Sequence, residues 1–212
     1  MSFDDTLIQY AEEPLTRQLM ISLLKDYKRP NDKIAELVKS GELISVKNGL
    51  YIPGHKSKVS KPEAFLIANH LWGPSYVSFE AALSHWGYIP ERVYEISSVT
   101  IKISKKYKTP AGRFTYRHAG LPYYSFGITN VLLSPKQRIL IASPEKAICD
   151  KIAMTAGVQL RSPAQGLSFL MENLRIDQDK LRELNTEKIA SWITASPKKD
   201  SLKMFTKALQ IL

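Results

Sequence analysis

The sequence predicts an α+β fold in two domains, residues 1–54 and residues 62–212. Three observations lead to this prediction. Apolar residues recur at helical spacing through residues 3–40, and apolar and polar residues alternate at a period of two in the middle of the chain. Helical spacing then returns from residue 144 to the end. The polar stretch of residues 55–63 is the expected linker between the domains.

The first domain begins with three predicted short helices. Thr16 is the expected N-cap of the second helix, and Pro30 separates that helix from the third. Asn31 or Asp32 caps the third helix, and Gly41 ends it. The inward-facing residues of the three helices are expected to be Phe3, Leu7, Ile8 and Ala11; Leu19, Met20, Leu23, Leu24 and Tyr27; and Ile34, Leu37 and Val38.

A tight hairpin is expected to complete this domain. Two short β-type runs, residues 43–46 and 50–52, flank Asn48-Gly49, a pair that favours a type I′ turn. Three helices followed by a hairpin predict a winged helix-turn-helix, in which the third helix enters the DNA major groove and the wing lies along phosphates. The expected DNA-binding residues are Lys28, Arg29, Asn31, Asp32, Lys33, Glu36, Lys39, Lys47 and Asn48.

These residues are expected to have two different tasks on DNA. Lys47, on the wing, should contact phosphate and so bind all sequences alike. The early residues of the third helix, Asn31, Asp32, Lys33 and Glu36, are the better candidates for reading base edges.

The second domain is expected to contain a central antiparallel sheet. Helices are predicted near residues 62–73 and after Ser78, the latter ending at Gly87. Two strands should follow, residues 97–104 and 112–118, joined by the connection 105–112 into one hairpin. Residues 123–133 and 138–143 should add further strands, and helices, the first capped by Ser143, fill the remainder. The buried face of the hairpin is expected to consist of Val99, Ile101, Ile103, Phe114 and Tyr116.

The charge of the chain is strongly basic and unevenly placed. The net charge is +10, and residues 96–144 contain eight Lys or Arg and no acid. Lys102, Arg113 and Arg117 are expected to share one face of the hairpin, which makes a second basic patch. DNA, RNA or an acidic protein partner could bind it, or it could be a solvated surface without a partner. A membrane is not expected there, because the apolar face is needed for the core. This second patch consists of Lys102, Lys105, Lys106, Lys108, Arg113 and Arg117.

Catalytic and metal-binding motifs are not recognisable in the sequence, so neither enzymatic activity nor a cofactor is expected. The four histidines lack ligand-like spacing, and the single cysteine, Cys149, falls in an apolar helical pattern that predicts a buried thiol. Glu145, Lys146 and Asp150 leave a metal-dependent nuclease open as an alternative. A helix N-terminus with a capping acid explains Glu145 better, because neighbouring helical residues point about 100° apart.

Several stretches together resemble the AbiEi family, the antitoxin and transcriptional repressor halves of AbiE type IV toxin–antitoxin systems. They are "NGLYIP" (48–53), "SYVSFEAALSHWGYIPE" (75–91) and "IASPEKAICDKI" (141–152). The resemblance runs over roughly residues 5–195, although the connection "KDYKRPN" lacks the small-residue turn usual in that family. It implies a winged-helix domain, a second α+β antitoxin domain and autoregulation of an operon. It also implies functional pairing with a nucleotidyltransferase-like toxin, without a stable complex.

The function expected from these observations is that of a DNA-binding repressor and antitoxin in the cytoplasm. The compartment follows from the single cysteine and the lack of a signal peptide. Two alternatives stay open: a nuclease-like enzyme directed to nucleic acid by a winged helix, and a protein-interaction adaptor that uses the basic hairpin.

Overall fold

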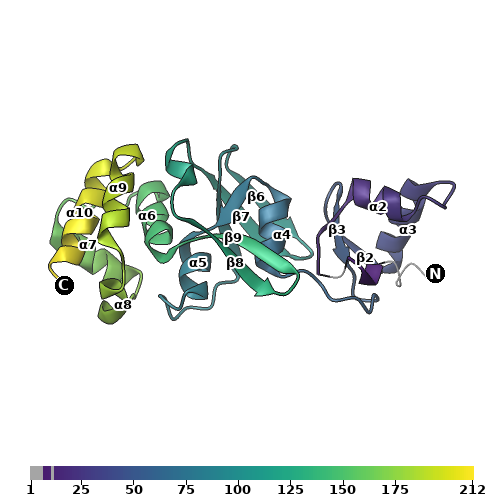
Figure 1. Ribbon diagram of the computed structural model, residues 1–212, viewed down its shortest axis with the longest axis horizontal. Helices are drawn as coiled ribbons and strands as arrows, with labels where there is room; N and C mark the ends of the chain where they lie inside the picture. The colour runs from purple at the N-terminus through teal and green to yellow at the C-terminus, as the bar shows by residue number, and fades with distance from the viewer. Residues whose placement is uncertain (1–6, 11) are drawn as a thin grey trace.

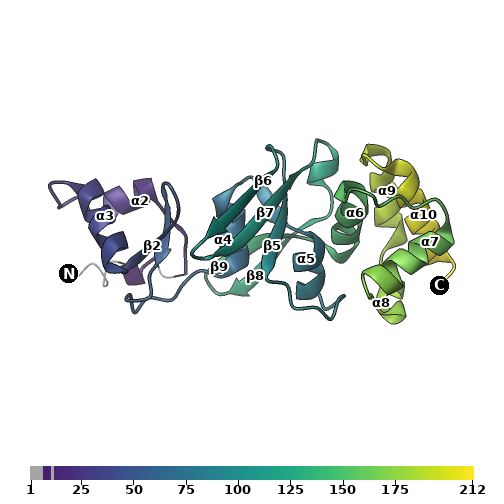
Figure 2. The ribbon, with the colours of Figure 1, turned by 180° about the vertical axis from the view of Figure 1, so that it is seen from behind.

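The computed structural model describes residues 7–10 and 12–212, so the expectations for Phe3 and Ala11 lie outside the described residues. The molecule is elongated (Figure 1). An N-terminal unit lies at one end, a sheet with two flanking helices in the middle, and the C-terminal helices at the other end; the reverse view shows the same order (Figure 2). No helix in the described part of the chain is long and apolar enough to cross a membrane.

The N-terminal unit consists of two helices and a small sheet. Strand β1 (Leu15–Thr16) leads into α2 (Arg17–Leu23), and α3 (Pro30–Ser40) leads into the hairpin of β2 (Leu43–Lys47) and β3 (Leu50–Pro53). The strands form an antiparallel sheet in the order β1-β3-β2. Its core is made by Leu7, Leu15, Met20, Leu24, Ile34, Leu37, Leu43 and Val59.

The observed ends of these helices agree in part with the ends predicted from the sequence. Thr16 caps α2 as expected, because its hydroxyl accepts from the Leu19 amide at 3.2 Å. Gly41 ends α3 with φ of +86°, the left-handed conformation that glycine tolerates. The expected cap of α3 at Asn31 or Asp32 is wrong, since the helix already begins at Pro30, whose fixed φ suits the first helical position.

Two expectations for the apolar faces are also wrong. Ile8 is 56 % exposed, and Tyr27 is 46 % exposed because α2 ends at Leu23, before the helical pattern reaches Tyr27. The hairpin turn is not type I′ either. A type I′ turn needs positive φ at both central residues, and of Asn48 and Gly49 only Gly49 has it, at +81°. The strand pairing also shifts register between Ser45 and Lys47, as in a β-bulge.

The β2–β3 hairpin contributes to two hydrophobic cores. Leu43 belongs to the core of the N-terminal unit, and Tyr51 packs against it. Val46, Leu50 and Ile52 instead belong to the large core of the rest of the chain. Because alternate side chains of a strand point to opposite faces, the hairpin is a wall shared by the two parts of the molecule.

The central sheet has six strands and is mixed, not antiparallel as expected. Its order is β6-β7-β5-β4-β9-β8, with β5/β7 and β4/β9 paired in parallel and the remaining neighbours antiparallel. Short β4 was not expected from the sequence. The bounds of the strands are Ser75–Val77 for β4, Glu95–Thr100 for β5, Lys105–Thr109 for β6, Gly112–His118 for β7, Ile128–Ser134 for β8 and Gln137–Ala142 for β9.

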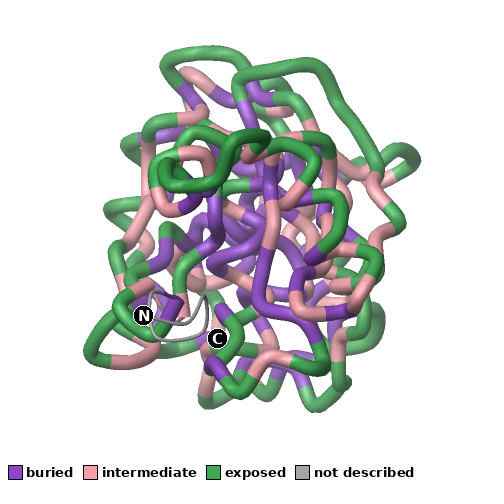
Figure 3. The backbone as a smooth tube through the Cα atoms, turned by 90° about the vertical axis from the view of Figure 1, so that its right-hand side faces the viewer, coloured by how far each residue is buried: buried purple, intermediate pink, exposed green. Residues whose placement is uncertain are grey.

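Helices cover both faces of this sheet. On one face Tyr116 donates its hydroxyl proton to the carbonyl of Ala68 in α4 (Ala64–Leu71) at 2.7 Å. On the other face Tyr76 points to α6 (Pro144–Met154), which packs beside α5 (Phe79–His85). The end-on view shows the buried segments gathered in the centre of the molecule, with exposed segments around them (Figure 3).

The predicted hairpin of residues 97–118 is paired differently. Strand β5 ends at Thr100, and Ile101 and Ile103, expected in the core, are 40 % and 74 % exposed. The expected connection contains β6, an edge strand that forms the true hairpin with β7. Strands β5 and β7 run side by side in parallel.

The C-terminal helices were largely expected. Ser143 caps α6 through a bond from the Lys146 amide at 3.3 Å, with Pro144 at the first position. The next helix, α7 (Pro163–Ser168), continues into a π-helical turn, Phe169–Asn173, which no sequence pattern predicted. The chain ends with α8 (Gln178–Arg182), α9 (Thr186–Trp192) and α10 (Lys199–Gln210).

Candidate nucleic-acid interface

Helix α3 presents a polar outer face at the end of the molecule. Ile34 and Leu37 point into the core, while Asn31, Asp32 and Glu36 are exposed. These side chains pair with one another and with α2. Arg29 contacts Asp32 at 3.6 Å, Lys33 contacts Glu36 at 2.8 Å, and Asn31 accepts from the guanidinium of Arg17 at 3.0 and 3.2 Å.

The remaining predicted residues of this unit lie at its surface, with one exception. Lys28, Lys39 and Asn48 are exposed. Lys47 is half-buried, and its ammonium donates to the carbonyl of Leu71 at the end of α4. This lysine of the β2–β3 hairpin therefore contacts the second part of the chain.

Lys47 belongs to a group of cations around one indole. The Nζ atoms of Lys47, Lys102 and Lys105 lie 5.9, 5.0 and 4.5 Å from the ring centroid of Trp72. The indole NH of Trp72 donates to the carbonyl of Ile103 at 3.1 Å. We call these four residues, Trp72, Lys47, Lys102 and Lys105, the Trp72 cluster.

The three ammonium groups of the Trp72 cluster repel one another. Burial lowers the pKa of Lys47, and the neighbouring ammonium groups of Lys102 and Lys105 lower it further. Cation–π attraction to the ring offsets part of this repulsion. A bound anion would relieve it, and phosphate and carboxylate are the anions common in biology.

The second basic patch does not form one face, contrary to the prediction. Lys105 pairs opposite Tyr116 on the α4 side of the sheet, whereas Lys106 and Lys108 pair opposite Thr115 and Arg113 on the other side. Lys102 lies in the loop after β5, next to Trp72 and so on the α4 side. The patch therefore divides between two surfaces because β6 is a strand whose side chains alternate.

Arg117 is a structural cation. Its guanidinium donates to the Met154 carbonyl at 2.8 Å, close to the end of α6, and lies 5.0 Å from the Phe79 ring. A cation at a helix C-terminus satisfies a carbonyl that lacks an intrahelical partner. Lys106, Lys108 and Arg113 remain as exposed cations on this side.

The residues that left a nuclease open are engaged in the interior. Lys146 and Asp150 are both fully buried and form an ion pair of 2.9 Å. The other carboxylate oxygen of Asp150 accepts from the hydroxyls of Tyr76 at 3.0 Å and Ser78 at 2.7 Å. Lys146 also donates to the Tyr123 carbonyl at 2.9 Å.

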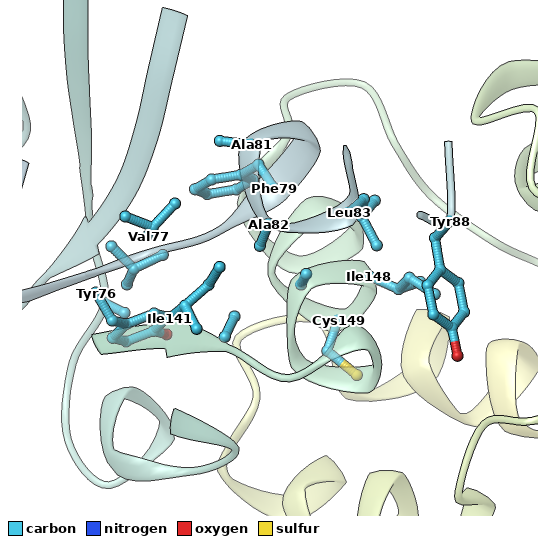
Figure 4. Close-up of a cluster of buried hydrophobic side chains, with 14 of the residues drawn as sticks. Tyr76, Val77, Phe79, Ala81, Ala82, Leu83, Tyr88, Ile141, Ile148 and Cys149 are labelled. Atoms are coloured by element: carbon cyan, nitrogen blue, oxygen red, sulfur yellow. The ribbon is translucent and has the colours of Figure 1, made fainter. Parts of the chain in front are cut away.

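This polar network lies at one end of an apolar core. Phe79, Leu83 and Ile148 pack between β4, α5 and α6, with Cys149 on α6 (Figure 4). Cys149 is buried as predicted, and burial raises its pKa, which keeps it a neutral thiol. Among the described residues no cluster of three or more His, Cys, Asp or Glu is placed to hold a metal ion.

Glu145 also has a structural role. One carboxylate oxygen accepts from the Ser143 hydroxyl at 2.7 Å, and the other accepts from the backbone N–H of Asn185 at 3.2 Å. It thus joins the start of α6 to the start of α9. The expectation of an acid beside a helix N-terminus is confirmed.

Comparison with known proteins gives a fold and no family. No protein-family model matches the chain, and no curated protein matches it. The structure is similar to the crystal structure of the RV2827C protein from Mycobacterium tuberculosis, with a TM-score of 0.61. The match covers 97 % of this chain and 75 % of that one, at 12 % sequence identity. It establishes a shared fold.

Sequence reasoning missed two residues at these surfaces. Arg17 lies beside α3 because α2 and α3 pack together, and its charge next to a predicted N-cap gave a weak signal. Trp72 was assigned only to the end of a helix. Its ring lies at the centre of a cation cluster because β6 and the loop after β5 place Lys105 and Lys102, 33 and 30 positions away in sequence, over it.

Proposed function

We propose that the chain is a DNA-binding transcriptional regulator whose N-terminal unit is a winged helix-turn-helix. The single observation that carries this proposal is the arrangement β1-α2-α3-β2-β3, in which β1 adds to the hairpin as a third strand. In such a unit the last helix inserts into the major groove and the hairpin contacts the backbone.

The surface of α3 has the chemistry for this task. Asn31 and Lys33 carry groups that can hydrogen-bond base edges. Arg17 and Lys39 are exposed cations beside and on α3, and they would contact the phosphates that flank an inserted helix. The intramolecular pairs on α3 keep these side chains ordered before binding. Each pair would exchange its partner for a base or a phosphate at little cost, because exposed ion pairs contribute little to stability.

We further propose that the regulator is the antitoxin of a type IV system and represses its own operon. The sequence resemblance to AbiEi proteins supports this, and two of the resembling stretches meet in space. Tyr76 and Ser78 from the first stretch bond to Asp150 from the second. The toxin partner would be nucleotidyltransferase-like.

The test is binding of the full chain to a fluorescent duplex from the region upstream of its own gene. Each phosphate contact releases about 0.9 of a counterion, and roughly four to six such contacts are expected from one module. The plot of log K against log[salt] should therefore have a slope of about −4 to −5. A duplex of the same composition in shuffled order is the control. Equal affinity for both duplexes, or a flat salt response, would contradict the proposal.

The antitoxin role needs a separate experiment. The proposal requires a nucleotidyltransferase-like toxin gene next to this one. Co-expression of the chain with that toxin should restore growth that the toxin alone arrests. A variant carrying Lys33→Ala and Lys39→Ala should lose repression and keep the rescue if the second part of the chain neutralises the toxin. Failure of the wild-type chain to rescue growth would refute the antitoxin role and leave DNA binding standing.

A further inference from the structure

A cavity of about 700 Å³ lies among α5, the end of α6 and α7. Figure 1 shows these helices away from α3, which lies at the N-terminal end of the molecule. The walls of the cavity come from α5, from the end of α6, from residues 157–161 and from α7 with its π-helical turn. This volume falls within the range of about 300–1,000 Å³ that small-molecule sites occupy. The proposed DNA-binding function makes no use of it.

The rim of the cavity is held in place by α10 and the residue before it. Lys198 donates to the carbonyls of Thr155 and Val158, both at 2.7 Å, and burial lowers the pKa of Lys198. The Leu160 amide donates to the Ser201 hydroxyl at 3.1 Å. The cavity is therefore formed before any ligand enters, which reduces the ordering cost of binding.

The charges of the cavity favour one anionic group. Lys151 forms an ion pair with Glu80, so these two lining charges compensate each other. Arg161 is exposed, and its guanidinium donates to the side-chain amide oxygen of Gln159 at 3.4 Å. No carboxylate of the described residues lies within 4.0 Å of that guanidinium. A planar guanidinium suits phosphate, which it binds in bidentate geometry.

The rest of the lining suits a flat, hydrogen-bonding body. Gln159, Gln165 and Asn173 present side-chain amides, which offer donors and acceptors together. Phe169 and Leu174 add an apolar surface beside them. A nucleotide combines the features that this lining suits, because it carries a phosphate and a planar base with several hydrogen-bonding groups at its edges.

Two backbone features single out this cavity. The π-helical turn Phe169–Asn173 contributes its first and last residues to the wall, and such turns are frequent at functional sites. Glu80 also lines the cavity, and the residue before it, Phe79, which is not part of the lining, has φ of +56°, a strained conformation for a residue with a side chain.

We propose that this cavity binds a nucleoside monophosphate group, either a free nucleotide or the 5′-terminal nucleotide of a strand. Arg161 holds the phosphate, and the side-chain amides and Phe169 hold the base. Arg117 connects the cavity to the basic surface of β6 and β7, because its guanidinium lies 3.5 Å from the hydroxyl of Thr155 on the rim. This binding is independent of the proposed function of the N-terminal unit.

Titration calorimetry of the full chain with the four nucleoside monophosphates, their nucleosides and inorganic phosphate tests the proposal. At least one monophosphate should bind with a Kd below about 1 mM, and its nucleoside and phosphate alone at least about tenfold more weakly. Arg161→Gln should weaken binding by at least about tenfold. Arg92→Gln, an exposed arginine outside the cavity, is the matched control and should not change it.

A second variant, Asn173→Ala, should change the preference among the four bases and leave the melting temperature unaltered. A 5′-phosphorylated trinucleotide then separates the two sources: tighter binding than the monophosphate assigns the site to a strand end, and equal or weaker binding assigns it to a free nucleotide. The proposal is overturned if no monophosphate binds, if inorganic phosphate binds equally well, or if Arg161→Gln binds as the wild type does. Loss of operator binding would not bear on it.

Discussion

The Nζ of Lys146 lies 2.9 Å from the Oδ1 of Asp150, one turn further along α6, and neither side chain reaches solvent. Asp150 also accepts hydrogen bonds from the hydroxyls of Tyr76 on β4 and of Ser78 at the start of α5. One carboxylate thereby ties a helix to a strand and to a second helix. Because the residues of this network come from two of the stretches that resemble AbiEi proteins, residues 75–91 and 141–152, the network gives those stretches a shared structural role.

Asp150→Ala should strongly destabilise the chain. The change leaves the Lys146 ammonium buried without its carboxylate, and removal of one member of a buried pair costs about 3–5 kcal/mol. Urea unfolding followed by circular dichroism measures this loss. The control is Lys151→Ala on the same helix, which breaks a partly exposed pair and should cost about 1 kcal/mol or less. Similar midpoints for the two variants would show that the network is not important for folding.

The chain should lose stability at alkaline pH. Burial raises the pKa of Tyr88 to about 12 and raises those of Tyr76, Tyr116 and Tyr123 above their usual value of 10. The unfolded chain therefore releases these protons first, so the stability is complete below pH of about 10 and falls as pH rises towards 12.

The urea midpoint measured from pH 8 to 12 checks this, with tyrosinate absorbance to report ionisation. Tyr88→Phe should show a smaller fall than the wild type, because it removes one of the titrating groups. A midpoint that stays constant through pH 11 would contradict the assignment of buried, neutral tyrosines.

Two lysines of the N-terminal unit should behave differently on DNA. Lys39 is exposed on α3, whereas Lys47 is held at the Leu71 carbonyl. Lys39→Ala should reduce the salt slope of binding by about 0.9, and Lys47→Ala should reduce it by clearly less. The original expectation for Lys47, a direct phosphate contact, requires equal reductions. Anisotropy titrations at four salt concentrations distinguish the two outcomes.

The two surfaces of the β6–β7 hairpin can be tested separately. Lys102→Glu with Lys105→Glu alters the Trp72 cluster, and Lys106→Glu with Lys108→Glu alters the opposite surface. We expect the first pair to weaken nucleic-acid binding at least about tenfold more than the second, since the cluster concentrates positive charge around one aromatic ring. Equal effects on affinity would mean that only the net charge matters.

Arg117→Glu should destabilise the protein, while Arg113→Glu should not. Arg117 donates to the Met154 carbonyl, and its loss leaves a half-buried helix end unsatisfied at a cost of about 1–3 kcal/mol. Arg113 is exposed on the same strand. Thermal unfolding of both variants checks this. Equal melting temperatures would show that Arg117 is only another surface cation.

Local signals predicted much of this fold. Caps such as Thr16 and Ser143, the stop at Gly41 and the alternation of Phe114 and Tyr116 were readable because each depends on a few neighbouring residues. The sheet order was not readable, because it depends on pairings between distant segments. The parallel neighbours β5 and β7 look like a hairpin when only their sequence separation is considered.

The misplaced strand boundary has a specific cause. Alternation continues through Ile101 and Ile103, yet the Thr100 hydroxyl donates to Pro74 and accepts from the Lys102 amide, which turns the chain. Strand β6 was hidden by its lysines, which have low strand propensity. Lysines are nevertheless common on edge strands, where they discourage pairing with other chains.

The candidate site was predictable only as a collection of charges. The exposed residues of α3 followed from the helical period, since Ile34 and Leu37 fix which face is inward. The Trp72 cluster and the network of Asp150 join residues from separate segments, so they required the tertiary structure.

The shared wall formed by the β2–β3 hairpin limits how this protein can be divided. In a fragment that ends at residue 54, the side chains of Val46, Leu50 and Ile52 would be exposed to water. The remainder of the chain would lose part of its core. Chimeras that exchange the N-terminal unit between proteins of this fold must therefore transplant the facing surface as well, or restore its complementarity. Selection acting on that end is similarly constrained: its helices can diverge freely on the outside, while the hairpin must keep fitting the body behind it.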